Sequence, residues 1–134
     1  MHATSTFATS DFRPEERESA VVTGVDVGIM TFSKTFAGDI DGRAETLFTS
    51  AYSHETGTGT YLAMESFAGS IGGRSGTVNI AHTATTTGDD RTHHLMVIVP
   101  ASGTAELAGI TGTGSLDIDP DGTHHFTLDY ELPT

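Results

Sequence analysis

The sequence predicts an all-β protein built as a closed antiparallel barrel of about eight strands with very little helix. Three observations support this prediction. Short runs rich in Thr, Val, Phe and Tyr alternate with turn residues at a spacing of about ten residues, and no helical period occurs after residue 20. The third observation is a central hairpin, residues 65–87, in which two strand-like arms flank the Gly-rich tip Ile-Gly-Gly-Arg-Ser-Gly.

The N-terminal 20 residues are polar and only partly regular. We expect a first strand near residues 2–9, then a loop, with Pro14 able to start a single helical turn. From residue 21 the pattern has a period of two, so that Phe32 and Lys34 share one face of the next strand while Val27 and Ile29 share the other.

Further strands follow in order along the chain. Residues 36–43 and 55–59 are expected to be turns, and Gly88-Asp-Asp, residues 109–112 and residues 119–122 also read as reversals. The expected strands between them are residues 44–54, 60–68, 75–87, 93–99, 104–108, 113–118 and 123–132.

An internal repeat supports a hairpin-based fold. Residues 36–43, Phe-Ala-Gly-Asp-Ile-Asp-Gly-Arg, are repeated as Phe-Ala-Gly-Ser-Ile-Gly-Gly-Arg at 67–74, and residues 107–114 form a degenerate third copy. Glycine at these positions allows positive φ or close backbone approach. A phosphate loop would open a helix, and none is predicted to follow, so the glycines are interpreted as turn geometry.

Composition excludes several classes of protein. The chain of 134 residues is expected to be one barrel domain, and it contains no cysteine, which excludes disulfides and thiolate chemistry. Its 18 acidic and 6 basic residues give a formal charge of -12, which argues against nucleic-acid and anionic membrane partners. No apolar stretch approaches the length of a membrane span, so we expect a soluble, cytoplasmic protein.

Two residues are the first candidates for chemistry. Glu65 lies in period with Tyr61, Ala63 and Phe67, and His82 shares an apolar face with its neighbours on the return arm of the hairpin. Burial raises the pKa of a carboxyl group, which suits a general acid or base. The alternatives are a structural role for Glu65 and a satisfied core position for His82.

Other polar residues are candidates for ligand contacts. Tyr52, Tyr61, Arg74, Asn79 and Tyr130 could line a pocket or orient a polar group, although cross-strand packing explains the tyrosines equally well. The adjacent pairs His93-His94 and His124-His125 point to opposite strand faces, so neither pair chelates one metal ion by itself. No metal site and no cofactor are predicted.

Several ordered motifs resemble one bacterial family. Residues 34–42, 64–76, 81–83, 99–109 and 128–132 are similar to the domain-of-unknown-function family 3224. The resemblance implies an allene-oxide-cyclase-like barrel with a cavity at one mouth, a fold also used by dirigent proteins and spirotetronate cyclases. It implies no catalytic residues, although Glu65, His82, Glu106 and Asp129 fall within the matching motifs.

The function predicted first is binding of an apolar small molecule, with a cofactor-free isomerisation or cyclisation in which Glu65 and His82 act as acid and base. Two alternatives stay open: a binding protein without catalytic activity for a lipophilic ligand, and a structural dimerisation module whose barrel is filled by its own side chains. An open cavity shared by Glu65 and His82 would favour the enzyme, and a filled barrel would favour the structural module.

Overall fold

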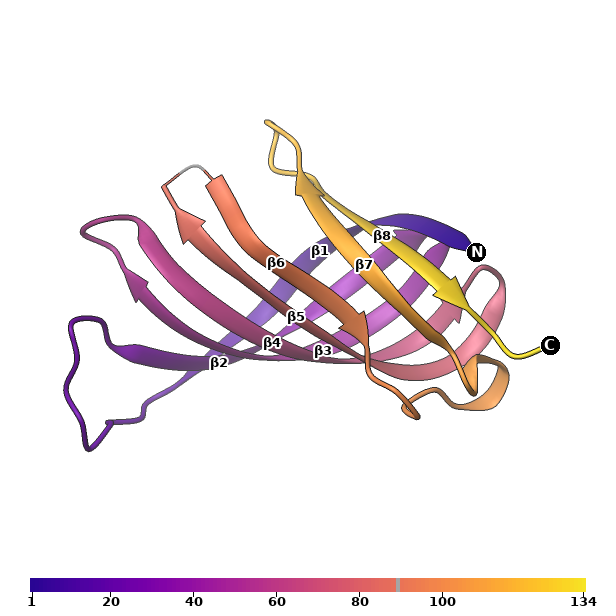
Figure 1. The fold of residues 1–134 in the computed structure, drawn as a ribbon, viewed down its shortest axis with the longest axis horizontal. Helices are drawn as coiled ribbons and strands as arrows, with labels where there is room; N and C mark the ends of the chain where they lie inside the picture. The colour runs from indigo at the N-terminus through magenta and orange to yellow at the C-terminus, as the bar shows by residue number, and fades with distance from the viewer. Residues whose placement is uncertain (89) are drawn as a thin grey trace.

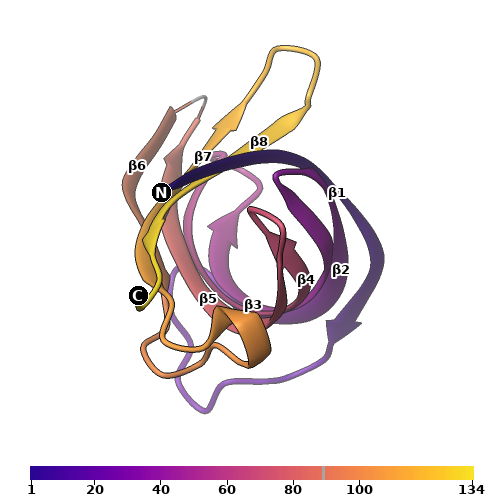
Figure 2. The same ribbon diagram turned by 90° about the vertical axis from the view of Figure 1, so that its right-hand side faces the viewer.

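Eight antiparallel strands form one closed ring in a computed structural model that describes residues 1–88 and 90–134. Each strand pairs with the next in the sequence, and β1 pairs with β8 to close the ring (Figures 1 and 2). The strands are β1 (His2–Glu15), β2 (Val27–Gly38), β3 (Ile40–Ser53), β4 (Thr58–Ile71), β5 (Arg74–Thr87), β6 (Asp90–Ile98), β7 (Thr111–Ile118) and β8 (His124–Glu131).

The predicted all-β antiparallel ring is confirmed, but several strands are longer than predicted. The turn predicted at residues 36–43 is confined to Asp39, because β2 continues to Gly38 and β3 begins at Ile40. The glycine of the first repeat, Gly42, lies opposite Gly69 of the second across β3 and β4. A Cβ on Gly42 would collide with the backbone of β4, so this pair of glycines permits close strand approach.

The predicted helical turn at Pro14 is wrong, because β1 continues to Glu15. A shift of register between Ser10 and Arg13 lets the strand resume its pairing with β2, where Pro14 lies opposite Met30. On its other side, β1 pairs with β8 only as far as Phe7. Proline is tolerated at Pro14 because this part of β1 is an edge that needs no donor on its outer side.

The predicted strand at residues 104–108 is also wrong. The segment forms a 3-10 helix, η1 (Ala105–Leu107), whose Leu107 is fully buried. Ala105 has a φ of 51, which is incompatible with a continued strand. The segment therefore covers the end of the barrel. The turn predicted at Gly88-Asp-Asp lies partly outside the described residues, since these omit residue 89.

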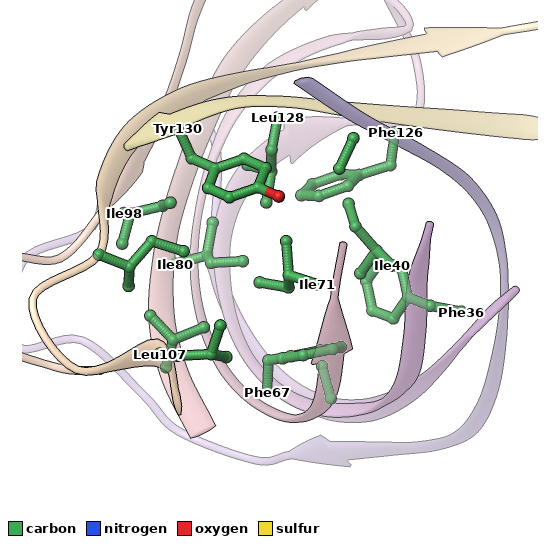
Figure 3. Close-up of a cluster of buried hydrophobic side chains, with 14 of the residues drawn as sticks. Phe36, Ile40, Phe67, Ile71, Ile80, Ile98, Leu107, Phe126, Leu128 and Tyr130 are labelled. Carbon is green, nitrogen blue, oxygen red and sulfur yellow. The ribbon is translucent and has the colours of Figure 1, made fainter. Parts of the chain in front are cut away.

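The two ends of the barrel differ. We call the end that carries both termini and η1 the closed end, and the end with the β1–β2, β3–β4, β5–β6 and β7–β8 connections the open end (Figure 1). Buried apolar side chains converge inside the ring at the closed end (Figure 3). They include Phe36, Ile40, Phe67, Ile71, Ile80, Ile98, Leu107, Phe126, Leu128 and Tyr130.

The extent of pairing between neighbouring strands differs around the ring. β3 and β4 pair along their whole length, from Ile40 opposite Ile71 to Ser53 opposite Thr58. β6 and β7 share a single registered pair, Val97 opposite Thr113. The seam between β6 and β7 is therefore the weakest closure of the ring. In the part of the chain that is described, no helix has the length and apolar character needed to cross a bilayer.

Candidate functional site

A buried polar layer lies above the closed-end core. Lys34 of β2 is in period with Phe32 and Phe36, and Glu65 of β4 is in period with Phe67, so both side chains point into the barrel. The prediction that Glu65 and His82 face the interior is confirmed, since they are 0% and 5% exposed.

Lys34 and Glu65 form an ion pair inside the barrel. Nζ of Lys34 contacts Oε1 of Glu65, and Thr46 donates its hydroxyl to the same oxygen at 3.3 Å. Nζ also lies 4.5 Å from the centre of the Phe7 ring, a favourable cation–π position. Oε2 of Glu65 has no hydrogen-bond partner among the described residues. The Glu65 carboxylate is thus paired with Lys34 and is not an isolated carboxyl group.

A second polar group, the Tyr61–His82–His94 network, lies nearer the open end. Nε2 of His82 is 3.0 Å from Oη of Tyr61 and 2.9 Å from Nε2 of His94. Arg91 donates from Nη1 to Oη of Tyr61 at 3.1 Å. The Tyr61 ring stacks on Phe48 with 5.1 Å between ring centres. Three neighbouring strands, β4, β5 and β6, therefore bring these groups together.

The histidines of this region are neutral at physiological pH. Burial is the main cause that lowers the pKa of His82 to about 3, and the positive charge of Lys34 adds to the effect. Burial followed by the charge of Arg91 lowers the pKa values of His94 and His124. Burial raises the pKa of Tyr61, and the charge of Arg91 opposes this shift. Tyr61 therefore keeps its hydroxyl proton.

The contact between the two imidazoles requires a particular arrangement of protons. A neutral imidazole carries hydrogen on one nitrogen only, so a hydrogen bond between two Nε2 atoms needs one of them protonated and the other bare. Because Arg91 donates to Tyr61, the hydroxyl proton of Tyr61 is donated either to a bare Nε2 of His82 or to another acceptor. The network can thus relay a proton between its groups.

A cavity of about 260 Å³ lies beside this network at the open end. Its apolar wall is mainly aromatic, and its polar groups include Lys34 at its base and Arg91 on β6. The aromatic residues are Phe7, Phe32, Phe48, Tyr52 and Tyr61. His82 and His124 also line it, whereas Glu65 does not.

A second hollow of about 650 Å³ adjoins this cavity beneath the β1–β2 connection. The two share Phe48, Tyr52, Tyr61 and Thr86 as lining residues. The cavity of about 260 Å³ is called the inner cavity below.

The residues predicted to contact a ligand fall into two groups. Tyr52 and Tyr61 line the inner cavity together with His82. Arg74, Asn79 and Tyr130 do not line it, which corrects the expectation of one shared pocket.

The reason is the position of each residue in its strand. Arg74 is exposed at the β4–β5 turn of the closed end. Asn79 alternates out of the ring and donates to the backbone oxygen of Glu65 and the hydroxyl of Ser66. Tyr130 belongs to the closed-end core (Figure 3). All three therefore lie away from the inner cavity.

Sequence reasoning missed Lys34, Arg91 and His94 as site residues. Lys34 did carry a signal, because it is the only lysine and shares a strand face with Phe32. Arg91 carried none, since it follows a turn and is exposed. Only the pairing of β6 with β5 brings Arg91 and His94 to Tyr61 and His82.

The two histidine pairs split between the interior and the outer surface. His94 joins the network and His124 lines the inner cavity. His93 is exposed, and Nε2 of His125 lies 2.6 Å from a carboxylate oxygen of Asp119. Within residues 1–88 and 90–134, the structure brings together no group of three or more His, Asp or Glu side chains that could hold a metal ion.

Comparisons with known proteins agree with the fold. The family model for DUF3224, a protein family of unknown function, matches residues 3–130, so the chain belongs to this family. A crystal structure of a DUF3224 protein of unknown function from Shewanella oneidensis MR-1 is similar at 28% identity and a TM-score of 0.88. The match covers 100% of this chain and 98% of that one. No curated protein matches.

Proposed function

We propose that this member of the DUF3224 family binds a small, largely apolar molecule in the inner cavity at the open end of its barrel. The observation that carries the proposal is the inner cavity itself, about 260 Å³ of space walled by aromatic rings next to a hydrogen-bonded polar network. Ligand sites combine apolar walls with a few converging polar groups in the same way.

The volume limits the ligand. The inner cavity is slightly smaller than the roughly 300–1,000 Å³ of typical drug-sized sites. A molecule of about ten non-hydrogen atoms fits, given that a water molecule takes up about 30 Å³ in the liquid. The adjoining hollow of about 650 Å³ provides room for a larger substituent to extend toward the β1–β2 connection.

A cofactor-free proton transfer is a second candidate function. It is favoured by the Tyr61–His82–His94 network, in which a protonated phenol lies 3.0 Å from a neutral imidazole at the cavity wall. A general acid and a general base must lie within hydrogen-bond reach of the proton they transfer. Tyr61 would take the role that the sequence suggested for Glu65, because the Glu65 carboxylate is paired with Lys34.

A cavity-filling substitution tests the binding function. Ala63 is 7% exposed and lines the inner cavity, so Ala63→Leu is expected to occupy part of its volume. Indole serves as the neutral apolar probe, with binding followed by saturation-transfer NMR. The matched control is Ala81→Leu on β5, opposite Met64, because alternate residues of β5 point into the barrel at His82 and outward at position 81.

The expected result is binding of indole by the unmodified protein and by the Ala81→Leu variant, and loss of binding by Ala63→Leu. Circular dichroism verifies that both variants keep the β-sheet fold. Equal indole binding by both variants would show that the probe does not occupy the inner cavity and would contradict the proposal.

Exchange of an activated C–H proton tests the second function. Phenylacetone in D₂O exchanges its benzylic protons through an enol, and its size matches the inner cavity. If the protein accelerates this exchange above its rate in buffer, and the His82→Asn variant does not although it still binds indole, the result supports proton transfer. If phenylacetone binds but its exchange is not accelerated, the proton-transfer function is contradicted and the binding function is retained.

A further inference from the structure

The charged side chains that line the inner cavity are opposite in sign to the net charge of the whole chain. The sequence contains 18 acidic and 6 basic residues. In the described part of the chain, the charged side chains that line the inner cavity are Lys34 and Arg91, and no Asp or Glu lines it. A protein of net charge -12 thus places two of its cations in the lining of one cavity.

Lys34 has hydrogen-bonding capacity beyond its ion pair. Its ammonium group has three donors, and the contact with Oε1 of Glu65 uses one of them. Glu65 contacts it from within the barrel but does not line the inner cavity, whereas Lys34 does. A ligand in this space therefore meets the cation of the pair and not the anion.

Arg91 supplies the second cation. Its guanidinium has five donors, and the contact of Nη1 with Tyr61 uses one of them. The carbon of the guanidinium lies 5.7 Å from the centre of the Tyr61 ring, which holds the charge near the cavity wall. Arginine recognises a carboxylate through paired N–H groups in one plane.

The remaining polar groups add donors. Tyr61 keeps its proton, and its hydroxyl is available to a ligand in the tautomer in which Nε2 of His82 carries its hydrogen and donates it to His94. His124, which lines the inner cavity, is neutral and supplies one N–H without further positive charge. A ligand oxygen that accepts several hydrogen bonds therefore suits this lining better than a ligand amine.

We propose that the inner cavity selects a small monocarboxylate whose apolar body lies against the aromatic wall and whose carboxylate faces Arg91, Tyr61 and Lys34. This inference rests on the proposed binding function and specifies its ligand class. The negative field of the surface disfavours the approach of anions in general, so local cations are needed to reverse it at the cavity.

Three probes of the same shape test the charge requirement. Cinnamate, cinnamamide and cinnamylamine differ mainly in the charge of the head group, and isothermal titration at pH 7 measures their binding to the full chain. We expect cinnamate to bind about tenfold more tightly than the amide, because hydrogen bonds to an ionised acceptor are roughly twice as strong as neutral ones. The amine is expected not to bind.

Arg91→Gln is the main variant, because the glutamine side chain keeps a donor and removes the charge. It is expected to reduce the preference for the acid over the amide, and Lys34 accounts for the preference that remains. Arg74→Gln, at the exposed turn of the closed end, is the matched control and should keep the full preference.

Lys34 is tested in a double variant, since Lys34→Met alone would leave Glu65 buried without its partner. Lys34→Met/Glu65→Leu is expected to reduce the preference for cinnamate without loss of the fold. This variant also shows whether the binding defect comes from the charge or from unfolding, which thermal denaturation monitors.

The outcomes separate the two proposals. Equal binding of cinnamate and cinnamamide overturns the carboxylate preference and leaves the apolar binding function intact. Tighter binding of the amine than of the acid also overturns it. Failure of the acid, the amide and indole to bind contradicts the proposed function itself.

Discussion

The closed and open ends of the barrel are built by the same strands but filled in different ways. At the closed end, inward positions such as Phe67 of β4 and Ile80 of β5 are apolar and almost fully buried. Two residues further toward the open end, the next inward positions of the same strands are Glu65 and His82. A strand pattern of period two therefore determines which residues point inward. It does not determine whether those side chains pack into a core or line a cavity.

The ion pair of Lys34 and Glu65 separates the two ends. Below it, Phe36 makes edge contacts with Phe67 and Phe126 at 5.6 and 5.4 Å between ring centres, as expected of a packed core. Above it, the Tyr61–His82–His94 network borders a cavity of about 260 Å³. The closed end thus provides stability, and the open end is free to vary in shape and chemistry.

The largest expected difference between the ends is the cost of removing an aromatic ring. Phe67→Ala deletes a ring that is 1% exposed and should lower the free energy of unfolding by about 4 kcal/mol. Phe48→Ala, in the half-exposed wall of the inner cavity, should cost about 1 kcal/mol because its space is already hollow. Urea denaturation compares the two, and equal losses would show that the open end is packed like the core.

The ion pair should give the next largest effect. Lys34→Met leaves a fully buried carboxylate without its partner and is expected to cost about 3 kcal/mol. Lys34→Met/Glu65→Leu removes both charges and should stay within about 1 kcal/mol of the unmodified protein. The exposed pair of Arg43 and Glu45 is the control, since Arg43→Gln should change stability far less than Lys34→Met does. A double variant less stable than Lys34→Met would refute this account.

The open end should also make stability depend on pH. The pKa of His82 is lowered from 6.5 to about 3 in the folded protein, so below pH 6.5 the unfolded chain binds a proton that the folded chain does not. Stability is therefore complete above pH 6.5 and decreases as the pH falls toward 3, with about 2 kcal/mol lost at pH 5.

Urea denaturation at pH 7 and pH 5 measures this loss. The His82→Asn variant should lose less stability between pH 7 and pH 5 than the unmodified protein. The control variant His93→Asn, at an exposed position, should lose as much as the unmodified protein. An unchanged decrease in the His82→Asn variant would mean that other groups cause the acid sensitivity.

The smallest expected effect compares one glycine at each end. Gly57 in the β3–β4 turn and Gly72 in the β4–β5 turn have similar φ values of 71 and 58. A Cβ on Gly57 would meet nothing within 4 Å, whereas one on Gly72 would meet Oη of Tyr130. Placing alanine at a positive φ costs a similar amount at both positions. The additional contact with Tyr130 should make the Gly72→Ala variant less stable than Gly57→Ala by about 1 kcal/mol in thermal denaturation.

Some features of the candidate site could be predicted from the sequence. Glu65 follows Tyr61 and Ala63 at intervals of two toward Phe67, so its inward direction is a local property of one strand. The same reasoning places His82 inside. The partners of these residues could not be predicted in this way, because Lys34 and Arg91 come from strands distant in sequence and depend on register.

The errors have related physical causes. The segment 104–108 contains residues that also suit a strand, but Leu107 gains more by burial at the closed end than by pairing. Pro14 begins many helices, yet here the edge of β2 provides a pairing partner and the preceding bulge absorbs the change of register. In both cases long-range packing outweighed a local preference.

By itself, the sequence determined the all-β architecture, the inward direction of Glu65 and His82, and the family, because alternation, turn residues and ordered motifs are local in the chain. Only the tertiary structure decided that Glu65 is paired with Lys34, that Tyr61, His82 and His94 form one network, and that the space beside them stays open. These features arise from how eight strands are staggered around the ring, and stagger is set by contacts between distant segments.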